Sequence, residues 1–426
     1  MDSMPKYASY KDSGVEWLGK LPTEWSLVAN KHIFNLKKNL VGKRSSEYEL
    51  LSLTLKGIIK RDMENPEGKF PAEFDTYQEV KVDDFVFCLF DVEETPRTVG
   101  LSSYDGMITG AYTVFDVKPE YEPRFLYYFY LNLDATKRLK PLYKGLRNTI
   151  PKDAFLSFKT FVPAREVQTA IADFLEQKTA QIDEAIAIKE KQIALLKERK
   201  QIIIQQAVTQ GLDPNVPMKD SGVDWIGQVP EHWEVKRLKY VLEERNERSK
   251  TGEEPLFMVS QAYGLVVRAD YHEKAEVASS NIDNKIVYEN DLVFNKLKAH
   301  LGVFFKSSIQ YKGLVSPDYA VYKCKAHIRD AKYLELLFRN SKYIEQFIIR
   351  ATGIVEGLIR LYTGDLFDIA VPIAPMNEQK SILEYVEKQS KAFDNAIEIQ
   401  EQQIEKLKEY KTTLINSAVT GKIKVA

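Results

Sequence analysis

Residues 165–209 read REVQTAIADFLEQKTAQIDEAIAIKEKQIALLKERKQIIIQQAVT, and residues 376–420 read MNEQKSILEYVEKQSKAFDNAIEIQEQQIEKLKEYKTTLINSAVT. The two stretches align without a gap at an offset of 211 residues, with 18 identities in 45 positions. Neither contains proline or glycine, and a seam of positions recurs at alternating spacings of four and three, which predicts two long helices. The residues expected to pack helix against helix are Ile182, Ile186, Ile193, Leu196, Ile203, Phe393, Ile397, Ile404, Leu407 and Leu414.

The length of these helices determines the architecture that we expect. A helix of 40 residues spans roughly 60 Å, which is too long for a small core, so each helix needs a partner. The natural partner is the other copy, and a pseudo-two-fold relation between the copies would make the helices antiparallel. Two separate core helices are the alternative. The polar majority outside the seam favours the exposed pair instead.

The repeat continues beyond the helices. Trp17 and Trp25 recur as Trp225 and Trp233, within the matching segments KDSGVEWLG and KDSGVDWIG. Further matches follow at an offset of 207 residues through the stretches between these segments and the helices. Chance similarity does not keep register along a whole half, so the chain is a duplicated unit of about 210 residues.

Each copy has three predicted parts. The middle part is rich in Val, Ile, Phe and Tyr runs broken by turn residues, which indicates strands with some helix, the helical stretches being 121–133 and 332–349. We therefore expect an α+β protein whose two homologous globular domains are separated by two long antiparallel coiled-coil helices. The predicted boundaries are a Trp/Gly/Pro segment at 1–25, a globular domain at 26–164, a helix at 165–212, the repeated segment at 213–233, a second globular domain at 234–375 and a helix at 376–426.

Composition sets limits on function. The 426 residues include 60 basic and 61 acidic side chains, so a uniformly basic nucleic-acid binder is excluded, although a basic face balanced elsewhere is not. The two cysteines are too few for a disulfide scaffold or a structural zinc site. No long apolar run or signal-peptide core is present, which predicts a cytoplasmic protein without a membrane segment.

Two patterns resemble catalytic motifs. Residues 14–20 have Walker-like spacing, but Leu21 stands where a Mg²⁺-binding Ser or Thr is needed, and no strand precedes the loop. Asp318 and Asp330 with Lys332 resemble a metal-nuclease set, but the first copy has Gly110-Ala111 at the Pro317-Asp318 position. We expect no catalytic residues and no metal site, and we read the chain as a binding and scaffolding protein.

Windows free of acidic residues give both globular domains a local basic character. Lys and Arg bind phosphates, and Arg also reads base edges, although a charge run is often only a solvated face. The candidate DNA-binding residues are Lys37, Lys38, Lys43, Arg44, Lys137, Arg138, Lys140, Lys144, Arg147, Lys152, Lys296, Lys298, Lys306, Arg350 and Arg360.

The order and duplication of these features resemble the specificity subunit of type I restriction-modification systems, along nearly the whole chain. The resemblance rests on the paired Trp segments, on the two divergent domains, and on helices that start near Gln168 and Gln379 and end in Ala-Val-Thr. The first helix departs from the usual Pro-x-x-Glu-Gln start, which is present at 375–379.

The resemblance implies a non-catalytic subunit that recognises a bipartite, asymmetric double-stranded DNA site, one domain for each half. The helices would set the unread gap and dock two methyltransferase (modification) subunits, which restriction (motor-nuclease) subunits then join. S-adenosylmethionine, ATP and Mg²⁺ would belong to these partners, with no cofactor in this chain. The alternative is a helical protein scaffold without direct DNA recognition, and an intrinsic nuclease is a third, weaker reading.

Overall fold

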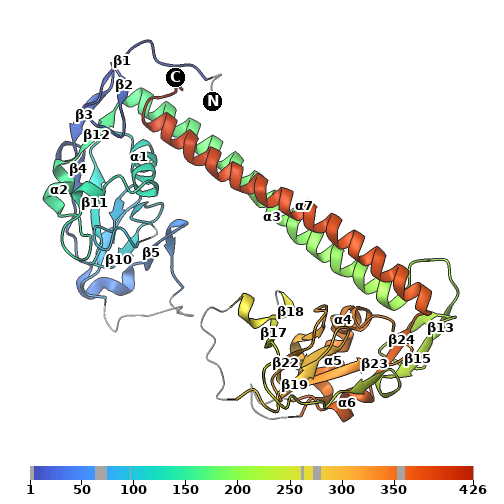
Figure 1. Cartoon of the computed structure of the whole chain (residues 1–426). Coiled ribbons are helices and arrows are strands. Elements are labelled where there is room, and N and C mark those ends of the chain that lie inside the picture. The colour runs from blue at the N-terminus through green and yellow to red at the C-terminus, as the bar shows by residue number, and fades with distance from the viewer. Residues whose placement is uncertain are drawn as a thin grey trace. The chain divides into compact units, whose positions relative to one another are not determined.

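The computed structural model describes residues 4–62, 74–95, 97–260, 263–271, 280–352 and 360–425. The chain divides into two compact units (Figure 1). Unit 1 is Met1–Glu190 with Glu401–Ala426, and unit 2 is Lys191–Gln400. Each unit contains a sheet-bearing globular domain and a section of both long helices, so the α+β class with two domains and a coiled coil is confirmed.

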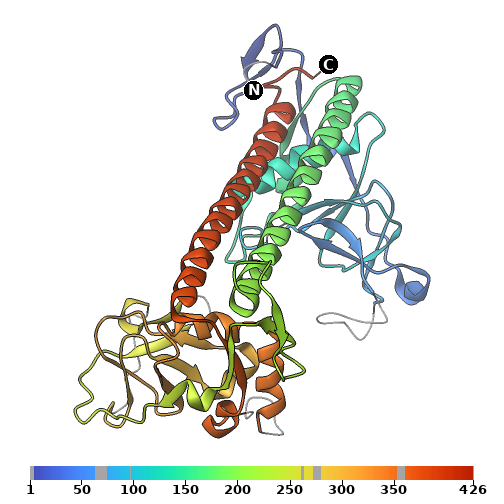
Figure 2. The same ribbon diagram turned by 90° about the vertical axis from the view of Figure 1, so that its right-hand side faces the viewer.

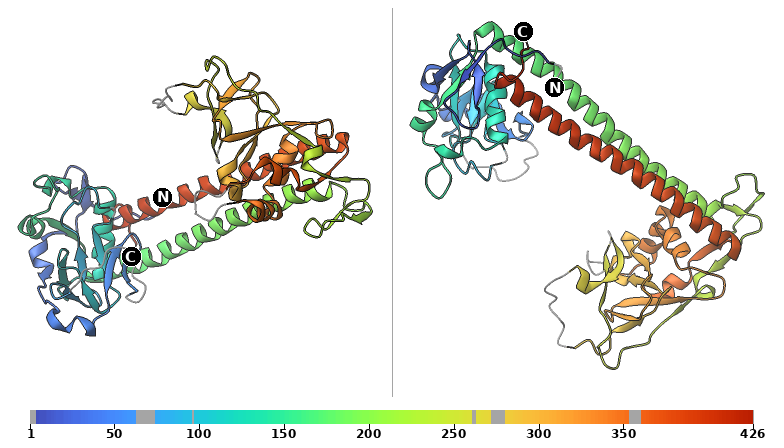
Figure 3. Two further views of the ribbon diagram at one scale, coloured as in Figure 1. Left: turned by 90° about the horizontal axis from the view of Figure 1, so that it is seen from below. Right: turned by 45° about the horizontal axis from the view of Figure 1, so that its top comes forward.

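The long helices are α3 (Arg165–Gln210, 46 residues) and α7 (Met376–Val419, 44 residues). They lie side by side and run antiparallel in each unit (Figures 2 and 3). In unit 1, Lys411 Nζ lies 2.7 Å from Asp183 Oδ2, and in unit 2, Lys200 Nζ lies 2.7 Å from Asp394 Oδ1. The two ion pairs are the same pair repeated at the offset of 211 residues, because each helix contributes the lysine to one and the aspartate to the other.

The predicted seam faces inward along its length. Ile182, Ile193, Ile397, Ile404 and Leu414 are buried, and the remaining predicted positions are partly buried: Ile186, Leu196, Ile203, Phe393 and Leu407.

The long helices also bury positions that the seam pattern omitted. Among these, Ile204 and Ile415, again equivalent in the repeat, belong to the cores of unit 2 and unit 1 respectively. There the helix packs against a globular core as well as against its partner helix, so its buried face is wider than an a/d stripe.

The globular domain of unit 1 is built on a four-stranded antiparallel sheet of order β4-β11-β8-β9, accompanied by the two-stranded pairs β1-β2, β3-β12, β5-β6 and β7-β10. The strands are β1 (Tyr10–Asp12), β2 (Lys20–Pro22), β3 (Ser26–Ala29), β4 (Phe34–Leu36), β5 (Leu51–Thr54), β6 (Gly57–Lys60), β7 (Gln78–Val80), β8 (Phe85–Phe87), β9 (Val99–Leu101), β10 (Gly106–Ile108), β11 (Thr113–Val117) and β12 (Lys159–Val162). The helices are α1 (Pro123–Ala135) and α2 (Lys152–Ser157).

Unit 2 repeats this plan, with the four-stranded order β16-β23-β20-β21 and the pairs β13-β14, β15-β24, β17-β18 and β19-β22. Its strands are β13 (Met218–Asp220), β14 (Gln228–Pro230), β15 (Glu234–Arg237), β16 (Leu242–Glu244), β17 (Phe257–Ser260), β18 (Gly264–Val267), β19 (Lys285–Val287), β20 (Leu292–Asn295), β21 (Phe304–Lys306), β22 (Gly313–Val315), β23 (Tyr319–Cys324) and β24 (Ala370–Ile373). Its helices are α4 (Lys332–Phe338), α5 (Ser341–Arg350) and α6 (Thr363–Phe367).

One predicted helix is interrupted. The sequence predicts a single helix over 332–349, but the structure divides it into α4 and α5 at Arg339-Asn340. The Asn340 side chain accepts a hydrogen bond from the backbone N–H of Lys342 and thereby caps α5, which is a common role for asparagine at a helix start.

Two of the four tryptophans, Trp25 and Trp233, mark where the ends of the long helices meet the globular domains. The buried side chain of Trp25 packs by Gly421, just after α7, and that of Trp233 packs by Gly211, just after α3. Both glycines have positive φ, +69° and +77°, and an added Cβ at Gly421 would lie 2.5 Å from Pro22. Glycine therefore both ends the helix and lets the Trp segment approach it.

The Walker-like stretch forms no phosphate loop. Residues 14–20 connect the antiparallel strands β1 and β2, Lys20 is exposed in β2, and Leu21 is buried. A phosphate-binding loop requires a strand, a glycine-rich turn and a helix N-terminus, and this hairpin supplies no helix.

Candidate nucleic-acid interface

The first predicted cation, Lys37, is engaged inside its own domain. Its Nζ lies 2.5 Å from Oδ2 of Asp84, whose side chain is 4% exposed. Asp84 also accepts a hydrogen bond from the backbone N–H of Lys81, 2.7 Å away. Burial raises the pKa of the Asp84 carboxyl, and the hydrogen bonds from Lys37 and Lys81 oppose that rise. The charge of Lys37 thus offsets a buried carboxylate, and its contact with DNA stays a prediction.

The second copy contains the same buried pair. Arg245 Nε donates to Oδ2 of Asp291 at 2.8 Å and Arg245 Nη2 donates to Oδ1 at 3.1 Å, while the Tyr288 N–H donates to Oδ2 at 2.9 Å. The Asp291 side chain is 2% exposed, and burial raises its pKa. Because both units carry the pair, it is a feature of the fold that the two domains share.

The cations that follow Lys37 are on the surface. Lys38, Lys43 and Arg44 are exposed, the last two in the 3₁₀ helix Gly42–Glu47. The Arg44 guanidinium lies 5.7 Å from the ring centre of Tyr48. Within the described part of the chain, Lys38 and Lys43 form no ion pair, so both are free to meet a phosphate.

Two cations of the acid-free stretch between Asp134 and Asp153 contact groups of the protein itself. Lys137 Nζ lies 3.1 Å from Asp134 and donates to the backbone carbonyls of Val92 and Thr95, each at 3.0 Å. The neighbouring Arg138 lies 4.4 Å from the ring centre of Trp17. Burial lowers the pKa of Arg138. Sequence windows could not separate these residues from surface cations, because local charge does not reveal which side chains turn inward.

The other cations between Asp134 and Asp153 lie on the surface. Lys140 pairs with Glu93 at 3.2 Å, and Arg147 forms a bidentate ion pair with Asp91. The hydrogen bonds from Arg147 lower the pKa of the Asp91 carboxyl. Lys144 and Lys152 are exposed and have no ion-pair partner among the residues that the structure describes.

The predicted cations of the second domain are mostly paired with neighbouring acceptors. Lys306 Nζ lies 2.7 Å from Asp330, and Lys296 lies 3.6 Å from Glu244. Arg360 lies 3.6 Å from the exposed Asp318, Arg350 donates to the side chain of Gln346, and Lys298 is exposed.

The resemblance to a metal nuclease finds no support in the geometry. Asp330 is held by Lys306, and Lys332 pairs instead with Glu335, 2.7 Å away. In the described ranges, no group of three or more His, Cys, Asp or Glu residues could hold a metal ion. Nor does any helix there combine the length and apolarity needed to cross a membrane.

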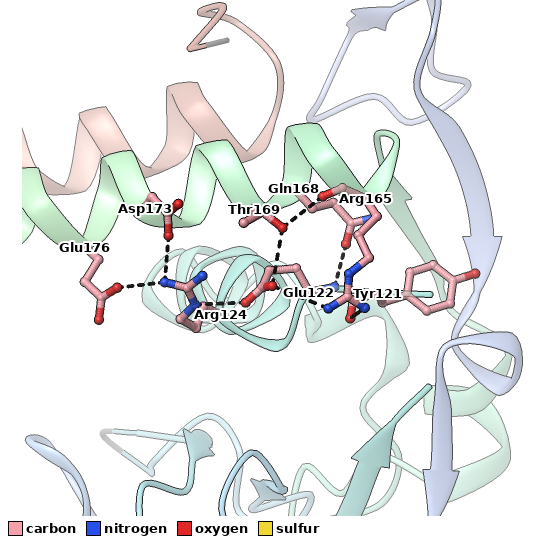
Figure 4. Close-up of polar contacts among 8 residues, drawn as sticks. All are labelled: Tyr121, Glu122, Arg124, Arg165, Gln168, Thr169, Asp173 and Glu176. Atoms are coloured by element: carbon pink, nitrogen blue, oxygen red, sulfur yellow. Dashed lines mark hydrogen bonds and ion pairs between the residues drawn. The ribbon is translucent and has the colours of Figure 1, made fainter. Parts of the chain in front are cut away.

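A junction that the sequence did not single out fastens the first domain to its helix (Figure 4). Arg124, at the start of α1, donates to Glu122 at 2.9 Å and to Asp173 and Glu176 on α3 at 2.8 and 2.9 Å. These contacts raise the pKa of the Arg124 guanidinium even further. Spacing on α1 alone could not reveal the junction, because its partners lie about 50 residues away.

The repeated glutamine completes both junctions. Gln168, 1% exposed, accepts from the Glu122 N–H at 3.0 Å and donates to the Pro163 carbonyl at 2.9 Å (Figure 4). Its equivalent Gln379, also 1% exposed, accepts from the Arg329 N–H at 3.3 Å and donates to the His327 carbonyl at 2.8 Å. This glutamine binds the loop ahead of the first domain helix to the start of the long helix. The altered start at Arg165 does not shift α3, which begins at the position equivalent to the start of α7.

Replacing Arg124 with alanine is expected to loosen this junction without unfolding the domain. The partners Asp173 and Glu176 are about 60% exposed, so the loss of stability should be about 1 kcal/mol. Hydrogen exchange should accelerate in peptides covering 121–124 and 165–176. Lys408→Ala is the matched control, because the ion pair that Lys408 forms in the described part of the chain is with Glu405 of its own helix. Unchanged exchange in the Arg124 variant would show that Gln168 alone holds the junction.

The known proteins to which this chain is similar come from one class, the type I restriction systems. No protein-family model matches the chain. A specificity subunit of the type I restriction enzyme MjaVIII from Methanocaldococcus jannaschii is 25% identical over 316 residues, which cover 70% of each chain. A putative type I restriction enzyme MjaX specificity subunit from the same organism is 26% identical over 321 residues, covering 72% of this chain and 70% of that one.

Solved structures share the fold. A chain from a study of complex assembly and conformational transition in a type I restriction-modification system aligns with a TM-score of 0.66, at 13% identity, over 94% of this chain and 98% of its own. The HsdS subunit from Thermoanaerobacter tengcongensis aligns with a TM-score of 0.54, at 13% identity, over 95% of this chain and 98% of its own. The fold is thus that of HsdS subunits. The similarity to type I specificity subunits that the sequence indicated is confirmed.

Proposed function

We propose that this chain is the DNA-specificity subunit of a type I restriction-modification complex. Each globular domain reads one half of a bipartite, asymmetric site in double-stranded DNA. The two helices hold the domains at a set separation and dock two methyltransferase subunits, which restriction subunits then join in the cytoplasm. The chain itself is non-catalytic, and S-adenosylmethionine, ATP and Mg²⁺ serve the partner subunits.

One observation carries this proposal, namely the duplication of the supporting structure under divergent surfaces. Sheet order, buried ion pair, Trp–Gly contact and junction glutamine are the same in both units. The candidate surface cations are not: the exposed set around Lys144 and Lys152 has no counterpart of equal charge in the second domain. Two copies of the same supporting structure fit two identical partner subunits. Surfaces that differ in their exposed cations fit two different half-sites of DNA.

Exchanging residues 26–164 for the corresponding domain of another specificity subunit is expected to change one half of the recognised site. The full chain is combined with its methyltransferase partner, and the methylated sites are mapped before and after the exchange. Replacement of one half-site with the other retained supports the proposal. Changes in both halves would contradict the assignment of one domain to each half-site, and methylation at a contiguous site would contradict a bipartite target.

The competing function is a helical scaffold that does not contact DNA. The salt dependence of DNA binding distinguishes direct recognition from a scaffold. A protein that neutralises several phosphates loses affinity steeply as the salt concentration rises. Sequence-specific binding with a steep salt dependence that weakens in Lys38→Ala/Lys43→Ala supports direct recognition by this chain. A salt slope and sequence preference unaffected by the exchange of either domain would favour the scaffold.

A further inference from the structure

The turn between Lys144 and Thr149 in the first domain has an unusual construction. The Lys144 N–H donates to the Thr149 carbonyl at 2.9 Å, and the Thr149 N–H donates back to the Lys144 carbonyl at 3.0 Å. The four residues between them form a tip in which Gly145 and Asn148 have positive φ, +70° and +43°. A glycine at the first of these positions and an asparagine at the other are the residues that accept this backbone most easily.

The tip is fixed to the domain from two sides. The Asp91 N–H donates to the Arg147 carbonyl at 2.8 Å, while the Asp91 carboxylate accepts both hydrogen bonds from the Arg147 guanidinium. Beyond the tip, the Ile150 N–H donates to the Leu89 carbonyl at 2.8 Å. The turn is therefore set by backbone and side-chain bonds together, and its outermost side chain is presented in a defined place.

That outermost side chain is Leu146, and it is fully exposed. The other exposed large apolar side chains of the described chain reach at most 72%, at Ile349. A single exposed leucine is ordinary on a protein surface. A leucine that projects from a pinned turn, with all its apolar area in water, is instead available for insertion into another molecule.

Two unpaired lysines close in sequence to the tip, in a domain that we propose to read DNA, favour a nucleic acid as that molecule. Lys144 and Lys152 carry positive charges that no described acid neutralises, and the nearby acids Asp91 and Glu93 are each paired with a cation. Glu94 and Asp153 are neighbouring acids, both exposed, that form no ion pair in the described chain. The two unpaired lysines therefore give a phosphate backbone cations to bind close in sequence to an apolar tip, in a region whose charges otherwise balance.

We propose that Leu146 is a wedge that enters the stack between two base pairs of the first half-site, with Lys144 and Lys152 on flanking phosphates. Apolar side chains that enter base steps in this way unstack them and kink the duplex, and the binding energy then depends on how easily that step deforms. Leu146 would thus select sequence through stacking, without a hydrogen bond to a base. This inference rests on the proposed function. In the second domain, Thr352 and Arg360 exchange the same pair of backbone hydrogen bonds, at 3.0 and 2.8 Å.

The test compares Leu146→Ala with the unaltered chain, each assembled with the methyltransferase partner, on a duplex containing the mapped site. 2-Aminopurine is placed at successive positions, because its fluorescence rises when it is unstacked. We expect the unaltered complex to brighten one step of the first half-site, and Leu146→Ala to lose that signal and about tenfold in affinity. Weakening the same step with a mismatch should tighten binding of the unaltered complex and leave the variant unchanged.

Val82→Ala is the matched control. Val82 is also an exposed apolar residue in a tight turn of the same domain, at 53%, but its neighbours Asp83 and Asp105 are acidic. It should bind and brighten the duplex like the unaltered chain. The signal at the methylated base, where the partner extrudes the nucleotide, is an internal reference that both variants should retain.

The remaining outcomes overturn the inference in distinguishable ways. If the unaltered complex binds its site and Leu146→Ala gives the same signal and affinity, the wedge is wrong and the proposed function stands. If Leu146→Ala fails to assemble with the methyltransferase, Leu146 contacts a protein instead. If the unaltered complex shows no specific binding at all, the proposed function fails together with the wedge.

Discussion

Arg245→Met is expected to destabilise unit 2 by about 3 kcal/mol, because it leaves the Asp291 carboxylate buried without its cation. Asp291 is 2% exposed, so water cannot replace the guanidinium. Hydrogen exchange in peptides covering Leu292–Asn295, the strand that follows Asp291, measures the loss without requiring the whole chain to unfold in one step.

The loss of stability in the Arg245→Met variant should depend on pH. Burial already raises the pKa of Asp291, and loss of Arg245 removes the hydrogen bond that opposes the rise. A carboxyl whose pKa is raised in the folded state contributes most below its unfolded pKa, and that contribution is lost as the pH rises through the folded pKa. The difference in the free energy of unfolding between the variant and the unaltered chain should therefore shrink as the pH falls from about 7 to about 4.

Arg237→Met is the control for the Arg245 variant. Arg237 pairs with Asp368 at 3.4 Å, but both side chains are about 60% exposed, so the expected loss is below about 1 kcal/mol. Adding Asp291→Asn to Arg245→Met should recover part of the stability, because the neutral amide costs less to bury. Equal losses in the two arginine variants would mean that Asp291 reaches water after all.

Trp233→Ala is expected to cost about 3–5 kcal/mol in unit 2. The Trp233 side chain is fully buried, packs by Gly211, and donates its indole N–H to Glu378 Oε2 at 3.1 Å. Its loss should free the second Trp segment from the end of α3, and limited proteolysis between 211 and 233 should report it. Tyr240→Ala, which removes an aromatic ring that is 58% exposed, is the control and should change little.

A finer comparison uses the two copies of this tryptophan. The buried Trp25 indole nitrogen finds no hydrogen-bond partner among the described residues, since Val167 stands where the second copy has Glu378. Trp233→Phe should therefore cost about 1 kcal/mol more than Trp25→Phe. Equal losses would show that packing alone determines the role of both tryptophans.

The sequence predicted the large features well for physical reasons. The period of the apolar residues determines the helices, and the gap-free repeat indicates that both are of one kind, which is why α3 and α7 begin at equivalent residues. The sequence did not indicate the break at Asn340, because the side-chain hydrogen bond that caps the start of α5 there is a local feature that the apolar pattern does not show.

The candidate interface was harder to predict, because the positions of charged residues in the sequence do not indicate whether their side chains face solvent or the interior of the domain. Lys37, Lys137 and Arg138 lie in acid-free windows, yet each contacts a group of its own domain. Most of the groups that they contact, such as Asp84 and Trp17, are far away in the sequence, although Asp134 lies only three residues from Lys137. The repeat held one usable signal, since Lys37-Asp84 recurs as Arg245-Asp291, and a recurrent pair of opposite charges favours a structural role.

The reciprocal ion pairs between the helices bear on the ancestry of the chain. Each helix supplies the lysine to one pair and the aspartate to the other, so a single copy of the unit already contains both halves of the contact. Such a surface is complementary to itself, and two identical half-length chains could bind through it as a symmetric dimer. The present chain can therefore have arisen by joining two copies of a gene whose product already paired with itself, after which each domain was free to diverge while the helices stayed under common constraint.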